Sequence, residues 1–377
     1  MRIAIDLTAL DDNFTGIERY ALNMALEILR QDQEDTFELV FKNKIFPDFA
    51  AFNHTEHVHC HVLDGCNKLL FNQWRLPCFL NKLKADACLF FAFPMPILQR
   101  GKQIYGTIHD MCCIDCPETM KRQMAWYFRL SYMCMARRAR RLITISEFSR
   151  GRIMELLHVQ PEQILTVYCG LSGRFLQKQM LTEADKAHIR EKYGLPETYY
   201  LCLSTLEPRK NLQLLLDVYL RLYKAGQIST KLVLAGRRGW KMDALLAETE
   251  AEQDGQIIVT GFVEDSDLPG LYQMAKCFVF PSLYEGFGIP PLEAMSQGVP
   301  VIASDATSLP EVLGDAAYYF RSNDGEALAV LLERFERGEA GELAEKIEAG
   351  IKRSESFRYE REAEKVVRSI HGAHSDK

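Results

Sequence analysis

Short apolar runs alternate with segments of helical period along most of the chain. In the first half, the runs are Ile3–Leu7, Phe37–Phe41, Ala87–Phe93, Ile104–His109, Leu142–Ile145 and Ile164–Tyr168. In the second half, they are Tyr200–Thr205, Leu232–Gly236, Ile257–Gly261, Phe278–Ser282, Val301–Ser304 and Ala317–Phe320. Between many of these runs, apolar residues recur at helical spacing, as at Ile17, Ala21, Met24 and Ile28. This alternation predicts βαβ units, and hence the α/β class with mostly parallel sheets.

A polar segment, 177–197, separates the two series of runs. It has helical character, and Thr182 is placed to cap its amino end. A chain of 377 residues is long enough for two domains. We therefore predict domains at 1–176 and 177–355, with a last helix over 356–372 that packs back on the first domain.

The charge and the termini exclude some classes of protein. A net charge of −6 argues against a general nucleic-acid binder, which usually carries a basic excess. No apolar run approaches the ~18 residues that a spanning helix needs. The first residues, MRIAIDLTAL, have no signal-peptide pattern. We expect a cytoplasmic protein.

Two clusters suggest metal ligands. Cys112, Cys113 and Cys116 give one C-x-x-C spacing but no second pair at zinc-site distance. His57, His59 and His61 alternate along a possible strand. We interpret the cysteines as buried, reduced side chains and the histidines as part of a polar edge strand, and we expect no metal site.

The stretch 284–304, YEGFGIPPLEAMSQGVPVIAS, carries two carboxylates, Glu285 and Glu293, separated by seven residues. It follows the strand pattern CFVFPS, and Pro291 suits the start of a helix. The loop therefore lies at the carboxyl end of a strand and beside a helix amino terminus, where an anion such as phosphate binds. Gly286 and Gly288 allow the main chain to approach a ligand closely.

Acids on both sides of a phosphate site suit sugar hydroxyls, and a nucleotide sugar offers ribose on one side and a hexose on the other. A first-turn helix acid and a solvated loop charge would explain the same two residues. The segment TLEPRKN favours the first interpretation, because Arg209 and Lys210 follow a strand in the same domain and suit a diphosphate.

Several motifs resemble the retaining glycosyltransferases of family four, which have the GT-B fold, and most closely members that act on mannose-type donors in bacterial surface-polysaccharide pathways. In order, the motifs are TGIERY, TIHDM, TISEFSR, STLEPRKN, LAGRRGW, TGFVEDSDLPGLYQMA, PSLYEGFGIPPLEAM, GVPVIAS and LPEVLGDAA. The resemblance covers most of the chain. It implies two Rossmann-like domains whose parallel sheets face each other across a cleft, the first for the acceptor and the second for the nucleotide sugar.

The resemblance also implies roles in the second domain. Glu285 would contact the donor sugar, Glu293 would bind ribose, and Arg209 and Lys210 would neutralise the departing diphosphate. The amides of Phe287, Gly288 and Ile289, together with Gly286, would bind the phosphate and the sugar hydroxyls of the donor. Gly236, Arg237 and Val263 would lie near its base.

In the first domain, Gly16 matches a glycine-rich turn near the donor phosphate, with Thr15 where relatives often have a second glycine. His109 resembles the histidine beside the donor sugar, although it could also be a capping or core histidine. Asp110 and Arg150 are candidates for acceptor-side contacts, and each could equally stabilise a loop.

The family retains anomeric configuration, with same-face attack while the leaving phosphate takes the acceptor proton, and it needs no metal or other cofactor. The expected partners are a nucleotide sugar, such as GDP-mannose or a related GDP- or UDP-sugar, and a glycan or lipid-linked oligosaccharide. The segment Lys121–Arg141 mixes aromatic and basic residues. It could lie weakly on an anionic membrane, at the inner face of the cell membrane, or be a domain helix with solvated arginines.

Rival functions remain open. An oxidoreductase should show G-x-G-x-x-G after its first strand, whereas Leu7–Tyr20 has one glycine. A nucleotide-sugar epimerase of the same architecture is closer. A non-enzymatic, two-lobed sugar-binding protein is disfavoured by the phosphate-suited basic pair.

Overall fold

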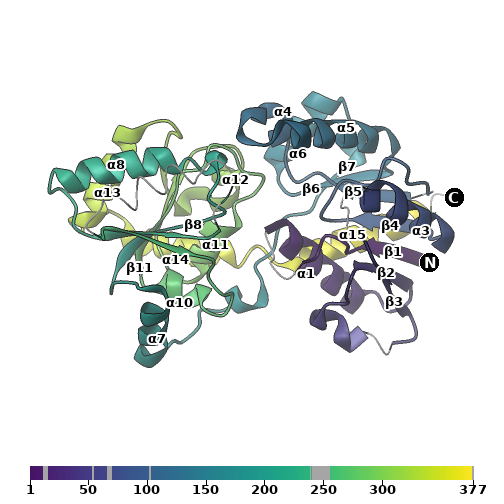
Figure 1. Ribbon diagram of the computed structural model, residues 1–377, viewed down its shortest axis with the longest axis horizontal. Coiled ribbons are helices and arrows are strands. Elements are labelled where there is room, and N and C mark those ends of the chain that lie inside the picture. Colours follow the sequence, from purple (N-terminus) through teal and green to yellow (C-terminus); the bar gives the residue numbers. More distant parts are fainter. Residues whose placement is uncertain are drawn as a thin grey trace. The chain divides into compact units, whose positions relative to one another are not determined.

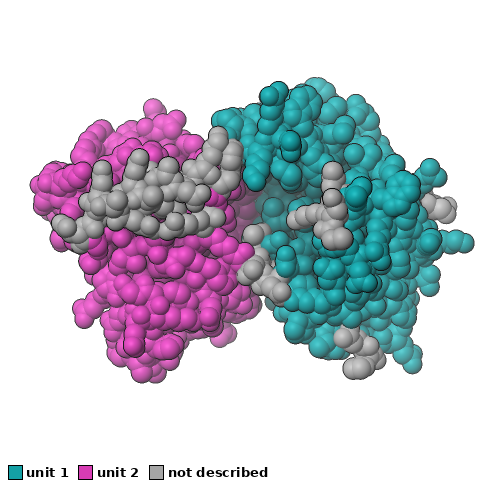
Figure 2. Space-filling view, in the orientation of Figure 1, with its two compact units in different colours: residues 1–170, 358–377 teal, residues 171–357 magenta. Residues whose placement is uncertain are grey.

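The computed structural model describes residues 1–11, 16–52, 55–65, 70–101, 103–237, 239 and 255–375. The chain forms two compact units, residues 1–170 with the segment from 358 onward, and residues 171–357 (Figure 2). The sequence placed the first boundary after residue 176 and the second after 355. The contacts divide the chain slightly differently because the Leu171 amide already donates to the Phe357 carbonyl, at 3.1 Å, inside the second unit.

Unit 1 contains a parallel sheet of seven strands in the order β3-β2-β1-β4-β5-β6-β7 (Figure 1). The strands are β1 (Arg2–Asp6), β2 (Thr36–Lys42), β3 (Val58–Leu63), β4 (Ala87–Phe90), β5 (Gln103–Thr107), β6 (Arg141–Thr144) and β7 (Ile164–Thr166). The polar strand predicted around His57–His61 is therefore the edge strand β3. There, His61 contacts Glu38 of β2, with 2.5 Å between Nε2 and Oε2.

Helices cover both faces of this sheet. One face packs against α3 (Leu76–Leu83), α5 (Arg122–Arg138) and α6 (Glu147–Leu157), which share an apolar core with alternate strand residues such as Ala4, Cys88 and Ile104. The short helix α4 (Cys112–Asp115) precedes α5. On the other side, α1 (Gly16–Gln31) packs against the last helix, α15 (Tyr359–Ser375). The expected return of the C-terminal helix to the first domain is seen in this packing and in the contact of His371 with Asp35, 2.9 Å from Nε2 to Oδ2.

Unit 2 contains a second parallel sheet, in the order β10-β9-β8-β11-β12-β13. The strands are β8 (Tyr199–Leu203), β9 (Lys231–Ala235), β10 (Ile257–Gly261), β11 (Ala275–Phe280), β12 (Val301–Ser304) and β13 (Tyr318–Phe320). One face forms a core with α8 (Leu212–Lys224) and α13 (Gly325–Glu336). The other α-helices among the described residues of this unit are α7 (Glu183–Tyr193), α10 (Leu268–Gln273), α11 (Ile289–Ser296), α12 (Leu309–Leu313) and α14 (Leu343–Ser354), and α11 packs against α14.

The predicted entry helix of unit 2 is α7, which begins with a capping box. The Thr182 hydroxyl accepts from the Asp185 amide at 3.2 Å, and the Asp185 carboxylate accepts from the Thr182 amide at 2.8 Å. Over the described residues, none of the helices combines the length and the hydropathy that crossing a membrane requires.

Candidate active site

The predicted donor residues of unit 2 lie along one edge of its sheet. They follow the carboxyl ends of β8, β9, β10 and β11, which are adjacent parallel strands. The chain runs outward from β8 through β9 to β10 and then returns to the other side of β8 with β11. Such a reversal leaves a crevice at the carboxyl ends of the two central strands, the usual ligand position in open α/β sheets. Arg209 and Lys210 follow β8, and Glu285 follows β11, so they lie at this crevice.

Arg209 and Lys210 are held by a short turn between β8 and α8. The segment Pro208–Lys210 is a single 3₁₀ turn, and Asn211 ends it with a left-handed backbone at φ 55°. The Arg209 carbonyl accepts from the Leu283 amide at 2.9 Å, which ties this turn to the loop after β11. The Arg209 guanidinium also donates to the Tyr284 carbonyl at 2.9 Å.

Glu285 forms the centre of a buried ion cluster. Its carboxylate accepts from Lys210 Nζ at 2.6 Å and from Arg209 at 3.4 Å, while Glu285 and Lys210 are only 6% and 8% exposed. Burial alone raises the pKa of the Glu285 carboxyl, but the charges of Lys210 and Arg209 outweigh it, so the pKa lies below its usual value. The carboxylate is therefore ionised at neutral pH.

Glu207 belongs to the same cluster, and the sequence reasoning missed it. Its Oε1 accepts from two nitrogens of Arg209, at 2.8 and 3.2 Å. The four side chains thus carry two positive and two negative charges. An incoming anion would have to share Arg209 and Lys210 with these acids. The signal was present, because Glu207 stands two residues before Arg209 at the same strand end.

The loop after β11 is fixed by two hydroxyl residues from the next strand connection. Thr307 Oγ1 donates to the Glu285 carbonyl and accepts from the Glu285 amide, both at 2.9 Å. Ser308 Oγ lies 2.9 Å from the Glu285 carbonyl and 3.0 Å from the Phe287 carbonyl. These contacts set the direction of the Glu285 backbone. Sequence reasoning did not single out Thr307 or Ser308, since their role depends on the neighbouring strand β12.

Gly288 is required by the backbone at the start of α11. Its φ is 108°, and an added Cβ would lie 2.6 Å from Cδ2 of Leu309. The helix begins at Ile289, two residues before the predicted Pro291, and Pro290 and Pro291 have no N–H to offer. Among the described residues, the amides of Gly288 and Ile289 have no protein acceptor. These two unpaired donors lie at the amino end of α11, the positive end of the helix dipole.

Glu293 lies one turn into α11 and is 6% exposed. Its Oε2 accepts from the hydroxyl of the fully buried Tyr272 of α10, at 2.9 Å. No contact joins Glu293 to Arg209 or Lys210 in the described part of the chain. The two glutamates of the motif consequently have different partners, cations for Glu285 and a phenol for Glu293.

Gly236, Arg237 and Val263 lie at the ends of β9 and β10. Gly236 has φ 121°, and a Cβ there would come within 1.9 Å of the Ser204 carbonyl oxygen, so only glycine fits. The Arg237 guanidinium stacks over the Phe262 ring, 4.7 Å from its centroid. Val263 is buried. Arg238 and Trp240 of the same motif lie outside the described residues.

His109 follows β5 in unit 1 and is 8% exposed. Its Nε2–H donates to the Phe91 carbonyl at 2.8 Å, and its ring meets the Tyr20 ring edge-on, with 5.4 Å between centroids. Burial lowers the pKa of this imidazole, which Asp110 only partly offsets. The ring is therefore neutral at pH 7. Tyr20 lies one turn along α1 from Gly16, so His109 and the exposed Gly16 belong to the same part of unit 1.

Asp110 and Arg150 are both engaged in local contacts. Asp110 accepts from the Cys112 amide at 3.0 Å, at the start of α4. Arg150 donates to Glu147 at 3.1 Å and to the Pro161 carbonyl at 3.3 Å. These contacts fit the loop-stabilising alternative. Thr15, beside Gly16, lies outside the described residues.

Unit 1 also has a hollow of about 410 Å³ at its own strand reversal, where β1 adjoins β4. Its walls come from the segments after β1, β2 and β4, from residues 71–72 and from the first turns of α5. The aromatic residues in it are Phe46, Phe71, Phe93, Tyr127 and Phe128. Lys42 and Lys44 line it too, each with its ammonium over a ring, that of Phe71 at 5.5 Å and that of Phe46 at 5.1 Å. Its volume lies in the range of about 300–1,000 Å³ typical of small-molecule sites.

Comparison with known proteins shows to which family part of the chain is similar. Residues 185–353, the greater part of unit 2, match the family described as "Glycosyl transferases group 1". The chain is 38% identical over 232 residues to the O-antigen chain mannosyltransferase B of Escherichia coli, covering 61% of this chain and 60% of that one. It is 33% identical over 210 residues to the Escherichia coli serotype-specific mannosyltransferase WbdA, covering 55% of this chain and 26% of that one. The chain thus spans less than two thirds of both relatives.

A solved structure shows the same fold over the whole chain. Alr3699/HepE of Anabaena, crystallised with UDP and glucose, superposes with a TM-score of 0.72 at 16% identity, covering 99% of this chain and 100% of that one. The resemblance to group 1 glycosyltransferases and the GT-B fold class, both predicted from the motifs, are confirmed.

Proposed function

We propose that this protein is a retaining, metal-independent glycosyltransferase that moves a hexose from a nucleotide sugar to a glycan or lipid-linked acceptor in surface-polysaccharide biosynthesis. GDP-mannose is the first donor to test. Relatives named as O-antigen mannosyltransferases support the reaction class and the pathway. A structural relative that holds UDP supports a nucleoside diphosphate as the leaving group.

The observation that carries this proposal is the Lys210–Glu285 pair beside the amino end of α11. The cations and the amides of Gly288 and Ile289 offer donors from two sides to a diphosphate. As the bond to the sugar breaks, negative charge grows on the leaving phosphate. Donors already in place stabilise that charge without reorganisation.

Glu285 would stabilise the positive charge that develops on the sugar ring, while Glu293 binds ribose. We do not assign a covalent nucleophile. The acceptor attacks the face from which the phosphate leaves, and the phosphate oxygen takes the acceptor proton. His109 is neutral and hydrogen-bonded through Nε2, so its role would be to position a sugar hydroxyl and not to supply charge.

The acceptor would occupy the aromatic hollow of unit 1. Its ring faces suit the apolar faces of sugar rings, and Lys42 and Lys44 suit an anionic group such as the phosphate of a lipid-linked acceptor. The outer face of α5 would contribute to weak attachment at the inner face of the cell membrane. On that face, Trp126 and Leu130 are 63% and 56% exposed, beside Arg122 and Arg129.

Thermal unfolding with nucleotides and sugar nucleotides tests this function. GDP or UDP, without added metal and with a chelator present, should raise the melting temperature. With GDP-mannose and a glycan acceptor, the product should carry the same anomeric configuration as the donor, as measured by proton NMR. Conversion of the nucleotide sugar without any acceptor would instead support the epimerase, and stabilisation by free sugars alone would support a sugar-binding protein.

A further inference from the structure

The connection between β4 and β5 differs from the other crossovers on its face of unit 1. Parallel neighbours are usually joined through a helix that covers the sheet. Residues 91–101 contain no helix, whereas α3 precedes β4 and α5 precedes β6 on this face. An irregular segment therefore fills the space where a helix would lie.

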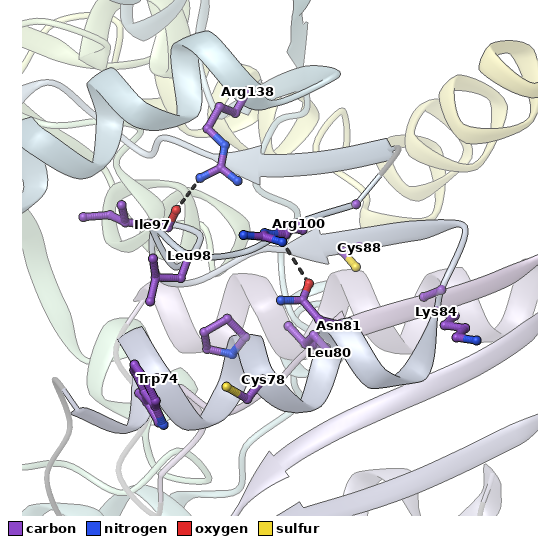
Figure 3. A pocket seen from close by; sticks show the side chains of 13 residues that line it. Trp74, Cys78, Leu80, Asn81, Lys84, Cys88, Ile97, Leu98, Arg100 and Arg138 are labelled. Carbon is purple, nitrogen blue, oxygen red and sulfur yellow. Dashed lines mark hydrogen bonds between the residues drawn. The ribbon is translucent and has the colours of Figure 1, made fainter.

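This segment is held in place by three side chains, and Figure 3 shows the contacts made by two of them, Asn81 and Arg138. Asn81 of α3 accepts from the Arg100 amide at 3.1 Å. Arg138 of α5 donates to the carbonyls of Ile97 and Gln99. Gln73, in the π-helical turn η2 (Phe71–Arg75) before α3, accepts from the Ile97 amide at 2.9 Å. The segment thus forms a fixed wall, and the space between it and α3 is a preformed groove of about 710 Å³.

The groove combines an apolar floor with a cationic rim. Pro77, Leu80 and Ile97 line it, and Trp74 and Leu98, at its mouth, are 68% and 52% exposed. Large apolar side chains with such exposure usually mark an interaction surface. The charged residues in its described lining are Lys84, Arg100 and Arg138, with no Asp or Glu among them.

Two of these cations are available to a ligand. Within the described ranges, the side chains of Lys84 and Arg100 make no hydrogen bond or ion pair, and both are exposed. Arg138 keeps its charge although its nitrogens hold the wall. The groove therefore presents a positive field that no protein carboxylate in its lining balances.

We propose that this groove binds one anionic phospholipid of a membrane, with an acyl chain along Pro77, Leu80 and Ile97 and the phosphate at Lys84 and Arg100. An acyl chain matches the apolar part of the lining, and the anionic head matches the cationic rim. Trp74 has the amphipathic ring that is enriched at membrane–water interfaces. The proposal rests on the membrane attachment in the proposed function and adds a specific lipid contact to it. The residues involved lie outside the α5 face, and lipid binding by them does not require transferase activity.

Vesicle binding tests the rim. The probe is a vesicle of phosphatidylcholine and phosphatidylglycerol in equal parts, compared with phosphatidylcholine alone. Lys84→Glu/Arg100→Glu should weaken sedimentation with the anionic vesicles at least about 25-fold, from about fivefold for each lost charge. The matched pair Lys82→Glu/Arg361→Glu makes the same change of net charge. Lys82 lies two residues before Lys84, on α3, and Arg361 lies on α15, and neither lines the groove. Because salt screens charges outside the groove, this control variant should change vesicle binding by no more than about twofold.

Fluorescence quenching tests the occupant. The chain has three tryptophans, so Trp126→Phe/Trp240→Phe leaves Trp74 alone. Phosphatidylglycerol brominated on its acyl chain should quench Trp74, and inorganic phosphate should not compete for binding. The proposal would be overturned if both charge-reversal pairs weakened vesicle binding equally, or if the brominated lipid did not quench Trp74. It would also be overturned if vesicle binding were lost only in Arg122→Glu/Arg129→Glu on α5. The groove variant should turn over a water-soluble acceptor at an unchanged rate. A failure of the lipid-binding proposal can therefore be distinguished from a failure of the proposed transferase function.

Discussion

The strand reversals of the two units carry different chemistry at corresponding positions. In unit 2, between β8 and β11, two cations and two acids pair in a largely buried cluster around Glu285. In unit 1, between β1 and β4, the hollow is walled by five aromatic rings and two lysines. Both units have a candidate ligand site where the topology leaves a crevice. Their side chains suit different ligands, a diphosphate in one and a sugar or amphiphilic acceptor in the other.

The motif residues of the two units also differ in the contacts that they make. In unit 2, the charged motif residues contact one another and leave main-chain donors unpaired beside them. In unit 1, Asp110 and Arg150 make hydrogen bonds that hold a helix start and a loop. A motif at a strand end therefore predicts where charged side chains gather better than it predicts which of them is free to meet a ligand.

The largest expected effect comes from breaking the buried pair in unit 2. Lys210→Ala leaves the Glu285 carboxylate buried without its closest cation, so we expect a loss of about 3–5 kcal/mol in the free energy of unfolding. Urea denaturation measures it. GDP should no longer stabilise this variant.

The double variant Lys210→Met/Glu285→Gln separates folding from function. It removes both charges, so most of the lost stability should return, while turnover should stay near background. Equal instability of the double and the single variant would mean that the cluster does not depend on this pair.

Glu285→Gln gives the next largest effect and acts on catalysis. The amide oxygen can still accept from Lys210, so the fold is kept, but the negative charge beside the sugar is lost. We expect kcat to fall about 10²–10³-fold, the cost of removing one preorganised electrostatic group. GDP affinity should be retained or increased, because the amide competes less for Lys210 and Arg209 than the carboxylate does. Parallel losses of kcat and of GDP affinity would contradict this division of roles.

Much of the fold could be predicted from the sequence, and the errors have a common cause. The strands at Ile257–Gly261 and Val301–Ser304 match the observed bounds. The predicted runs Ala87–Phe93 and Ile104–His109 extend past the observed strand ends at Phe90 and Thr107. They were predicted too long because Phe91 and Ile108, the next residues, are also fully buried. Apolar periodicity reports burial, and burial continues past the last strand residue.

The candidate site was predictable where its residues directly follow neighbouring strands. Arg209, Lys210 and Glu285 share an edge that the βαβ pattern alone defines. Thr307 and Ser308 act through contacts with a neighbouring loop, so single motifs did not single them out. Glu207 was missed although it stands in the same motif as Arg209, its partner. The hollow of unit 1 draws its walls from several separate segments, and only the folded chain brings these together.

The smallest expected effect tests the aromatic hollow. Met124 of α5 lines it and is 42% exposed, so Met124→Trp should narrow the hollow without disturbing the core. The KM for the acceptor should rise several-fold, about 1 kcal/mol of binding, while kcat and GDP affinity stay unchanged. Met133→Trp is the matched control, since Met133 lies on the same helix at 36% exposure and outside the hollow. If the control raised the acceptor KM equally, or if Met124→Trp impaired GDP binding, the acceptor would not occupy this hollow, and the contrast between the two edges would need another explanation.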